Sequence, residues 1–327
     1  MVILSVSKRG RVHEKLKKPC QDRSLVKKIG KDTWILTLAD GHGGFPYVRS
    51  GLGAKIACRT AQKIMADESI QVDEYPQKIK AAFDSYTEKH LHLHPLTDEE
   101  KKKLGSRPET YAYGTTLLAV KISPKGTYRV QLGDGKLSVL DTFGAPFNEL
   151  PADPNCYANI TSSLVQPDAR FRISYQEDSA SAVVLNSDGY EPEGGFPWKL
   201  LNNAIENWET YQESDLREEM VSEDHRGDDQ TIVLFLNENA FTEKYKKEVR
   251  EQAAEEAEKV YKFHKQEKLL EEKRELEAFL TAGLRKYREM ENDAEAAGFR
   301  EKSLKPRYQA YNAVCVELEC LLNEMAE

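Results

Sequence analysis

The stretch TWILTLADGHGG, residues 33–44, joins an apolar run to an acidic, glycine-rich turn. Residues 33–40 have the apolar and β-branched composition of a strand. The glycines that follow Asp40 allow turn dihedrals and let a ligand approach the backbone closely. Asp40 therefore ends a strand at a point where its carboxylate is available to a binding site.

Other strands of the chain are also bounded by aspartates. VVLNSDG places Asp188 after a strand, and QLGDGKL places Asp134 in a turn between two strands. In HRGDDQTIVLF, Asp228 and Asp229 precede a strand instead. One such aspartate is an ordinary turn residue, but four segments with a matching strand context favour a shared site.

The chemistry of such a site follows from its charge. If antiparallel strands bring these carboxylates together, each like-charged pair about 4 Å apart costs on the order of 1–4 kcal/mol, so a cation must offset the repulsion. Oxygen ligands without convergent His or Cys favour Mg²⁺ or Mn²⁺ over zinc or copper. Two such ions lower the pKa of a shared water and bind the oxygens of an in-line phosphoryl displacement.

Length and charge exclude several classes of protein. Single domains run to about 100–250 residues, so a chain of 327 residues fits one catalytic-sized domain with an appended element. A net charge of −8 disfavours a general nucleic-acid binder. No apolar run reaches the roughly 18 residues of a membrane helix, and the N-terminus lacks a signal-peptide pattern. We expect a cytoplasmic protein that binds neither nucleic acid nor membrane.

The cysteines are five in number, dispersed, and without a CxxC pair. This pattern argues against a disulfide framework and against a structural zinc site. We expect reduced thiols at Cys20, Cys58, Cys156, Cys315 and Cys320.

The amino-acid composition of the chain changes near residue 240. Before it, helical spacing predicts helices over 47–67 and 73–92 and, less clearly, 197–211. We interpret Gly114, Thr115 and Thr116 as close packing of a core strand. The segments with strand composition are 2–7, 33–40, 114–123, 127–132, 136–141, 181–188 and 231–237.

The segment after residue 240 consists almost entirely of helix-forming residues. Residues 241–293 contain no proline and would extend about 80 Å as one straight helix. Their apolar stripe predicts a helical hairpin or coiled coil, with Gly298 and Pro306 interrupting the chain before a last short helix. A solvated, charged spacer is the alternative.

A family resemblance rests on six motifs. In order, PCQD, LADGHGG, YGTTLLAV, QLGDGKLSVL, LNSDGY and GDDQTIVLF resemble successive motifs of the metal-dependent PPM (type 2C) protein serine/threonine phosphatases. The resemblance spans about residues 2–237. It implies an α+β fold, a four-layer α-β-β-α sandwich of two antiparallel sheets. The phosphatase domain would occupy residues 1–239 and the helical extension residues 240–327.

The same resemblance implies metal ligands. Asp40 resembles the carboxylate that bridges both metals, and the Gly41 carbonyl would bind the second metal. Asp188 and Asp228 resemble the remaining ligands of the first metal. Asp22 would complete the shell of the second metal, directly or through water.

The resemblance also implies a third metal site and a proton donor. Asp134, with Asp188, resembles the site of a third, weaker metal. His42 resembles a general acid to the leaving oxygen, and an ordinary pKa near ~6.5 would suit that role. A turn histidine that faces solvent is the alternative for His42.

Phosphate recognition departs from the family pattern. The family usually has an arginine five residues before the QD acid, but this chain has Lys17 there. Lysine binds phosphate as a point charge and lacks the planar fork of arginine. The candidates for contacting the substrate phosphate are His13, Lys17 and Lys18. His13 precedes the acid by nine residues, which resembles a bacterial subgroup of the family.

Other signals are set aside. The histidines of HLHLH, residues 90–94, would align for zinc or nickel on a strand, but a solvated helix end before Pro95 fits better. The chain has no GK[ST] of a P-loop, no C-x5-R thiolate signature and no D-x-D, so nucleotide binding and covalent phosphatase mechanisms are disfavoured.

The sequence thus predicts a Mg²⁺- or Mn²⁺-dependent phosphatase acting on phosphoserine or phosphothreonine in proteins, through a water activated by two metals. The tail would dimerise or bind a protein partner. A non-catalytic relative that acts as a scaffold through its tail, and a phosphatase of small phosphorylated metabolites, are the alternatives.

Overall fold

The computed structural model describes residues 1–151, 153, 161–222 and 227–326 of the chain. By its contacts the chain divides into two compact units, Met1–Gln252 and Ala253–Glu327. Cys156 lies outside the described residues, whereas the other four cysteines are unpaired. No helix among the described residues is long and apolar enough to cross a membrane.

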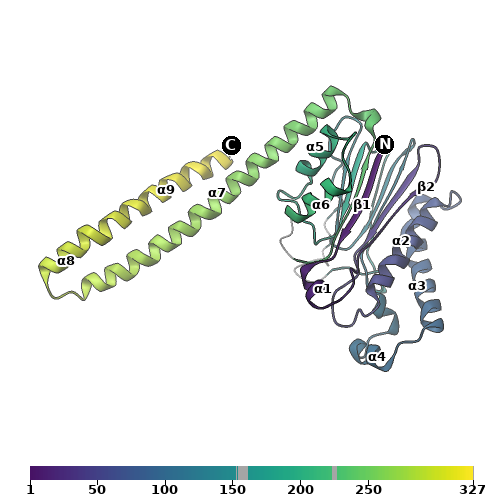
Figure 1. Cartoon of the computed structure of the whole chain (residues 1–327), viewed down its shortest axis with the longest axis horizontal. Helices are drawn as coiled ribbons and strands as arrows, with labels where there is room; N and C mark the ends of the chain where they lie inside the picture. The colour runs from purple at the N-terminus through teal and green to yellow at the C-terminus, as the bar shows by residue number, and fades with distance from the viewer. Residues whose placement is uncertain (152, 154–160, 223–226, 327) are drawn as a thin grey trace. The chain divides into compact units, whose positions relative to one another are not determined.

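Two antiparallel sheets form the centre of the first unit (Figure 1). The five-stranded sheet has the order β2-β3-β4-β5-β7, and the four-stranded sheet has the order β1-β9-β8-β6. The strands are β1 (Val2–Lys8), β2 (Arg23–Lys28), β3 (Trp34–Ala39), β4 (Leu117–Ser123), β5 (Gly126–Leu132), β6 (Lys136–Leu140), β7 (Arg172–Gln176), β8 (Ala182–Asn186) and β9 (Gln230–Leu236).

Alternate residues of each central strand face different layers. In β3, Leu36 and Leu38 belong to the apolar cluster between the sheets, together with Val233 and Phe235 of β9. Ile35 of the same strand belongs to the cluster under the helices of the five-stranded sheet. Successive strand side chains point to opposite faces, so a strand covered on both faces reads as a continuous apolar run.

Helices cover both outer faces of the sheets. Figure 1 shows α2 (Ser50–Ala66) and α3 (Tyr75–Leu93) on one side, and α5 (Trp198–Glu206) and α6 (Glu213–Ser222) on the other. The predicted four-layer sandwich is confirmed. Short elements complete this unit: α1 (Arg11–Lys15), α4 (Asp98–Leu104), η1 (Val72–Glu74), η2 (Glu109–Tyr113) and η3 (Glu238–Ala240).

The seven strands expected from the sequence are present, but two others were missed. Both β2 and β7 lie at the edges of the five-stranded sheet and are largely polar, with no fully buried residue. An edge strand that is only partly covered lacks the apolar run that identifies a central strand. The predicted strand 114–123 begins only at Leu117. The helix predicted over 197–211 ends at Glu206, and α6, which follows it, was not predicted.

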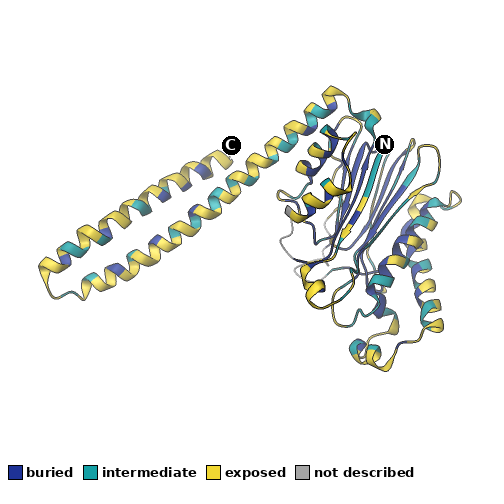
Figure 2. Ribbon diagram, in the orientation of Figure 1, coloured by how far each residue is buried: buried dark blue, intermediate teal, exposed yellow. Residues whose placement is uncertain are grey.

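A helical hairpin forms the second unit. Its arms are α7 (Glu243–Arg288), which begins in the first unit, and the run of α8 (Asp293–Phe299), η4 (Arg300–Leu304) and α9 (Lys305–Ala326). The contact between the arms is an apolar cluster of Leu269, Leu276, Val314, Leu318 and Leu321. Figure 2 shows that most of the remaining hairpin surface is exposed.

The hairpin confirms one of the two predicted forms of the tail and corrects a detail. Gly298 and Pro306 do not separate the last helix, because α8, η4 and α9 follow one another without a break. Pro306 is the second residue of α9, in the first helical turn, where the missing N–H is tolerated. The last helix has 22 residues instead of a short stretch.

The first turns of α7 belong to the first unit. Tyr245 and Val249 are 1% and 0% exposed, and the Tyr245 hydroxyl lies 2.8 Å from Ser181 Oγ. Both residues pack next to Gly144. The sequence predicts the domain boundary between residues 239 and 240. Because the start of α7 packs on the first unit, we propose a boundary after Gln252 instead.

Candidate metal centre

Three of the predicted carboxylates converge where strands of the two sheets end. Asp40 follows β3, Asp188 lies shortly after β8, and Asp22 directly precedes β2. Burial raises the pKa of Asp40 well above its ordinary value, and the charges of Asp22 and Asp188 raise it further. Segments far apart in the sequence therefore bring these three side chains together.

Asp22 has the environment that most needs a cation. Its residue is 1% exposed, and neither carboxylate oxygen has a hydrogen-bond partner among the described residues. Burial raises the pKa of Asp22 to about 7, and the charge of Asp229 adds to this shift. A buried carboxylate without donors is costly unless a cation binds it, so this oxygen-only group fits a hard divalent ion.

Asp228 lies at the open side of this group. It is exposed, directly precedes the buried Asp229, and accepts a hydrogen bond on Oδ1 from the Asp229 backbone N–H at 2.8 Å. Partial desolvation raises the pKa of Asp228, and the charge of Asp188 contributes. Asp228 therefore lies within electrostatic range of Asp188.

Two threonines before β4 fix the turn at Asp40. Thr115 Oγ1 and the Thr116 backbone N–H donate to the Asp40 carbonyl at 2.8 and 2.9 Å. The Asp40 backbone N–H in turn donates to Thr116 Oγ1 at 3.0 Å. The expected close packing of Gly114 to Thr116 is present, since a Cβ on Gly114 would collide with the Tyr47 ring, but these residues precede β4 instead of belonging to it, and the two threonines also hold the acidic turn. The polar residues GTT before the apolar run LLAV could have indicated in the sequence that this segment precedes the strand.

Gly41 is required by close contact. A Cβ at this position would lie 2.8 Å from both the Gln21 carbonyl oxygen and the Ser50 carbonyl carbon, closer than real contacts allow. The turn therefore passes against the segment that carries Asp22. Any side chain at position 41 would push these two parts of the site apart.

His42 does not project freely into solvent. Its ring lies edge-on to Tyr47, with 4.8 Å between centroids, and its backbone N–H donates to the Gly114 carbonyl at 3.1 Å. Burial lowers the pKa of His42 to about 4. The ring is therefore neutral near pH 7 in the metal-free protein, and its role as a general acid stays a prediction.

Of three other predicted site residues, Asp134 and Lys17 are exposed and Lys18 is not. Asp134 lies in the turn between β5 and β6, and Lys17 and Lys18 follow α1. Lys18 is partly buried, whereas Lys17 is fully exposed with a φ of 54°. The backbone N–H groups of Lys18 and Lys17 donate to the carbonyls of His13 and Glu14, the pattern of a Schellman C-cap.

Replacing Lys17 by glycine should increase stability by roughly 0.5–1 kcal/mol, because glycine adopts positive φ without steric cost. The measurement is urea unfolding of both proteins. If Lys17 only caps α1, phosphatase activity should be unchanged. A loss of activity at unchanged stability would instead support Lys17 as a phosphate contact.

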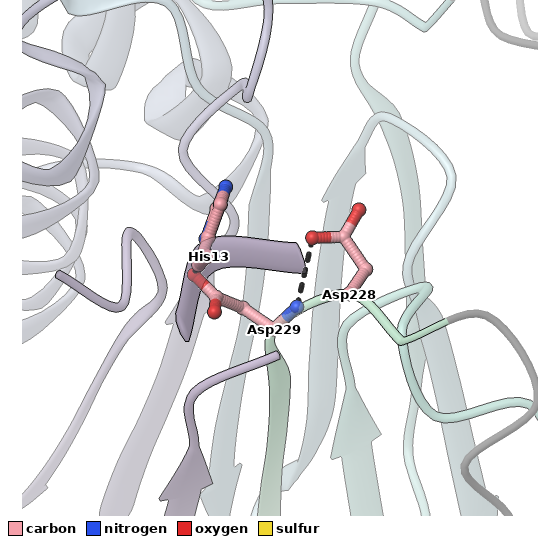
Figure 3. A group of neighbouring side chains, drawn as sticks. All are labelled: His13, Asp228 and Asp229. Atoms are coloured by element: carbon pink, nitrogen blue, oxygen red, sulfur yellow. Dashed lines mark hydrogen bonds and ion pairs between the residues drawn. The ribbon is translucent and has the colours of Figure 1, made fainter. Parts of the chain in front are cut away.

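A histidine and an aspartate that the sequence did not pair lie next to this group. His13 Nδ1 is 2.8 Å from Asp229 Oδ2, and both side chains are buried. His13, Asp228 and Asp229 offer ligand atoms within 4.8 Å of one another (Figure 3). The sequence motifs assign no role to Asp229, because only the first acid of the Asp228–Asp229 pair matches the metal ligand of the family motif.

The HLHLH segment forms the end of α3, as predicted. His92 and His94 are exposed, and His90 Nδ1 lies 2.7 Å from the Tyr113 hydroxyl. That hydroxyl accepts from Arg49, which also binds Glu100 of α4 through two hydrogen bonds of 2.9 Å. His90 therefore belongs to a network that attaches α4 to the domain.

Metal-free protein should lose stability as the pH rises. The folded-state pKa of Asp22 is about 7 against an ordinary 3.8, so between these values the folded state holds a proton that the unfolded state has released. Stability therefore falls over this window, by up to about 4 kcal/mol. The free energy of unfolding is measured with urea, in EDTA, at several pH values between 3.8 and about 7. Asp22→Asn should make the slope shallower without removing it, because the pKa values of Asp40 and Asp228 are raised as well, and an unaltered slope in that variant would refute the assignment.

Comparison with known proteins identifies the family and the fold of the chain. The model of the protein phosphatase 2C family matches residues 9–237, and a sequence search of curated proteins found no match. The S. agalactiae serine/threonine phosphatase superposes with a TM-score of 0.50 at 17% identity, covering 72% of this chain and 99% of that one. The Mycobacterium tuberculosis phosphatase PstP/Ppp gives 0.50 at 16%, covering 72% and 98%.

A further solved structure, the catalytic domain of PstP in complex with two manganese ions, gives a TM-score of 0.50 at 16% identity. It covers 71% of this chain and 96% of that chain. At these identities the structural neighbours show a shared fold. With the family model matching most of the first unit, the chain belongs to the protein phosphatase 2C family.

Proposed function

We propose that this chain is a Mg²⁺- or Mn²⁺-dependent phosphatase that removes phosphate from serine or threonine side chains of proteins. The observation that carries the proposal is the group of Asp22, Asp40 and Asp188: the charges of Asp22 and Asp188 raise the pKa of Asp40, and the buried carboxylate of Asp22 has no hydrogen-bond partner among the described residues. Divalent ions held there would neutralise the charge of the phosphate and activate a water molecule.

The protein's own residues would prepare this chemistry. Thr115 and Thr116 fix the Asp40 turn, which positions the carboxylate before any ligand enters. Asp228 lies at the open side, where it would complete the set of ligands next to the substrate. Asp134, with Asp188, is the candidate for a weaker third ion.

His42 is the proposed proton donor to the leaving oxygen. Its low pKa in the metal-free protein arises from burial. An entering phosphate dianion favours the charged imidazolium and so raises that pKa towards neutrality. The hairpin would act on partners or on a second copy of the chain rather than in the chemical step.

The test is Mn²⁺-dependent release of phosphate from a phosphothreonine peptide by the full chain. We expect turnover with Mn²⁺ or Mg²⁺, and none after treatment with EDTA. Activity that is indifferent to EDTA would refute the proposal. Turnover of small phosphorylated metabolites, with none of the phosphopeptide, would replace the proposed substrate class.

A further inference from the structure

The carboxylate of Asp229 is occupied by donors from the N-terminal segment. Oδ1 accepts from the Gly10 backbone N–H at 2.8 Å. Oδ2 accepts from the Gln21 backbone N–H at 2.6 Å and is 2.8 Å from His13 Nδ1. Asp229 is only 3% exposed. One buried side chain at the start of β9 therefore holds both ends of the segment from Gly10 to Gln21.

This arrangement argues against a further metal site at His13, Asp228 and Asp229, although the three lie close enough to share an ion. Asp229 already accepts three hydrogen bonds, and the nitrogen of His13 nearest to it is used in one of them. A carboxylate offers about four lone-pair sites, so an ion would have to displace contacts that fix the backbone.

The bond to Asp229 determines where the other ring nitrogen of His13 points. With Nδ1 bound to Asp229, Nε2 faces Gly43, and a Cβ on Gly43 would lie 3.7 Å from it. Nε2 has no hydrogen bond to the described residues. In Figure 3, the outer nitrogen of His13 and the carboxylate of Asp228 point to the same side. Gly43 belongs to the turn that carries Asp40, so Nε2 lies at the border of the candidate metal centre.

We propose that His13 contacts the phosphate group of the substrate through Nε2, and that Asp229 is the positioning residue that holds the ring in this orientation. This inference rests on the proposed phosphatase function. With Nδ1 held by Asp229, a ring that carries protons on both nitrogens would present Nε2–H to a phosphate oxygen, and a charge-assisted bond of this kind is short and strong. A carboxylate behind a functional histidine fixes its tautomer and its direction.

His13 suits this role better than the lysines. Lys17 is exposed and takes part in the C-cap of α1, and its long, mobile side chain must lose conformational freedom to bind. His13 is 5% exposed and already held in one orientation. A group that is ordered before the ligand arrives costs less to use.

Two substitutions of His13 separate positioning from contact. In His13→Asn, the amide nitrogen replaces Nδ1 and retains the bond to Asp229, but nothing replaces Nε2. In His13→Gln, the longer side chain brings its amide nitrogen near the place of Nε2 and loses the bond to Asp229. A purely structural histidine would tolerate Asn better than Gln. A phosphate contact would tolerate Gln better than Asn.

The probe is inorganic phosphate, titrated by ³¹P NMR into the full chain loaded with Mg²⁺, with melting temperature and Mg²⁺ affinity as controls. We expect His13→Asn to bind phosphate about 10- to 100-fold more weakly at unchanged melting temperature and Mg²⁺ affinity. Asp229→Asn should weaken phosphate binding by a smaller factor, and the double variant should match His13→Asn, because Asp229 acts through His13.

Wild-type phosphate affinity in His13→Asn would overturn the proposal. Additive effects in the double variant would do the same, as would an equal loss of Mg²⁺ affinity in His13→Asn. If Asp229→Asn does not fold, the two His13 variants still decide the matter. A chain that binds phosphate through His13 but hydrolyses no phosphopeptide would refute the proposed function and leave this contact intact.

Discussion

Asp40→Asn is expected to abolish Mn²⁺-dependent hydrolysis of a phosphothreonine peptide, with a loss of at least about 10³-fold in kcat, because several kcal/mol of transition-state stabilisation depend on the ions that it would hold. Asp40 is the residue whose carboxylate is affected by both Asp22 and Asp188. Removing its charge removes the centre of the ligand group. The measurement is kcat against Mn²⁺ concentration.

The same substitution should make the metal-free protein more stable. Burial and two neighbouring charges raise the pKa of Asp40, so an uncharged amide relieves repulsion in the absence of ions. A higher melting temperature in EDTA together with lost activity would distinguish this effect from misfolding. Asp32→Asn is the matched control, because Asp32 is exposed and precedes the same strand at its other end. Asp40→Asn with more than a tenth of wild-type activity would contradict the assignment.

Two truncations are expected to differ sharply in stability. Ending the chain after Gln252 should leave the first unit folded and its hydrolysis of small aryl phosphates intact, because it removes only the hairpin unit. Ending it after Ala240 also removes Tyr245 and Val249, which are fully buried. Loss of one large buried aromatic costs about 3–5 kcal/mol. That is a large part of the roughly 5–15 kcal/mol that stabilises a domain.

Urea unfolding of both truncated chains measures the difference, and phosphatase assays of the longer chain test its activity. Tyr245→Phe in the longer chain is a milder control, since it removes only the hydroxyl that contacts Ser181. Equal stability of the two truncations would place the boundary at residue 240 after all. Unchanged sedimentation and partner capture in the absence of the hairpin would contradict its proposed role in association.

Local sequence was sufficient for the central strands, because β3, β8 and β9 are buried on both faces and show this as apolar runs. It was not sufficient for β2 and β7, whose place in the sheet depends on pairing with β3 and β5 rather than on their own composition. The hairpin was predictable as helix, yet the pairing of its arms through Leu276 and Val314 depends on contacts distant in sequence.

For the site, the sequence by itself predicted the kind of chemistry, because acids at strand ends without convergent cysteine or histidine favour hard divalent ions. Only the tertiary structure decided which groups share one environment. It buried both oxygens of Asp22 with no hydrogen-bond partner among the described residues, assigned Thr115 and Thr116 to the Asp40 turn, and joined His13 to Asp229 across more than 200 residues. Burial and hydrogen bonding depend on neighbours in space, and those neighbours are set by the packing of the two sheets rather than by any local stretch of chain.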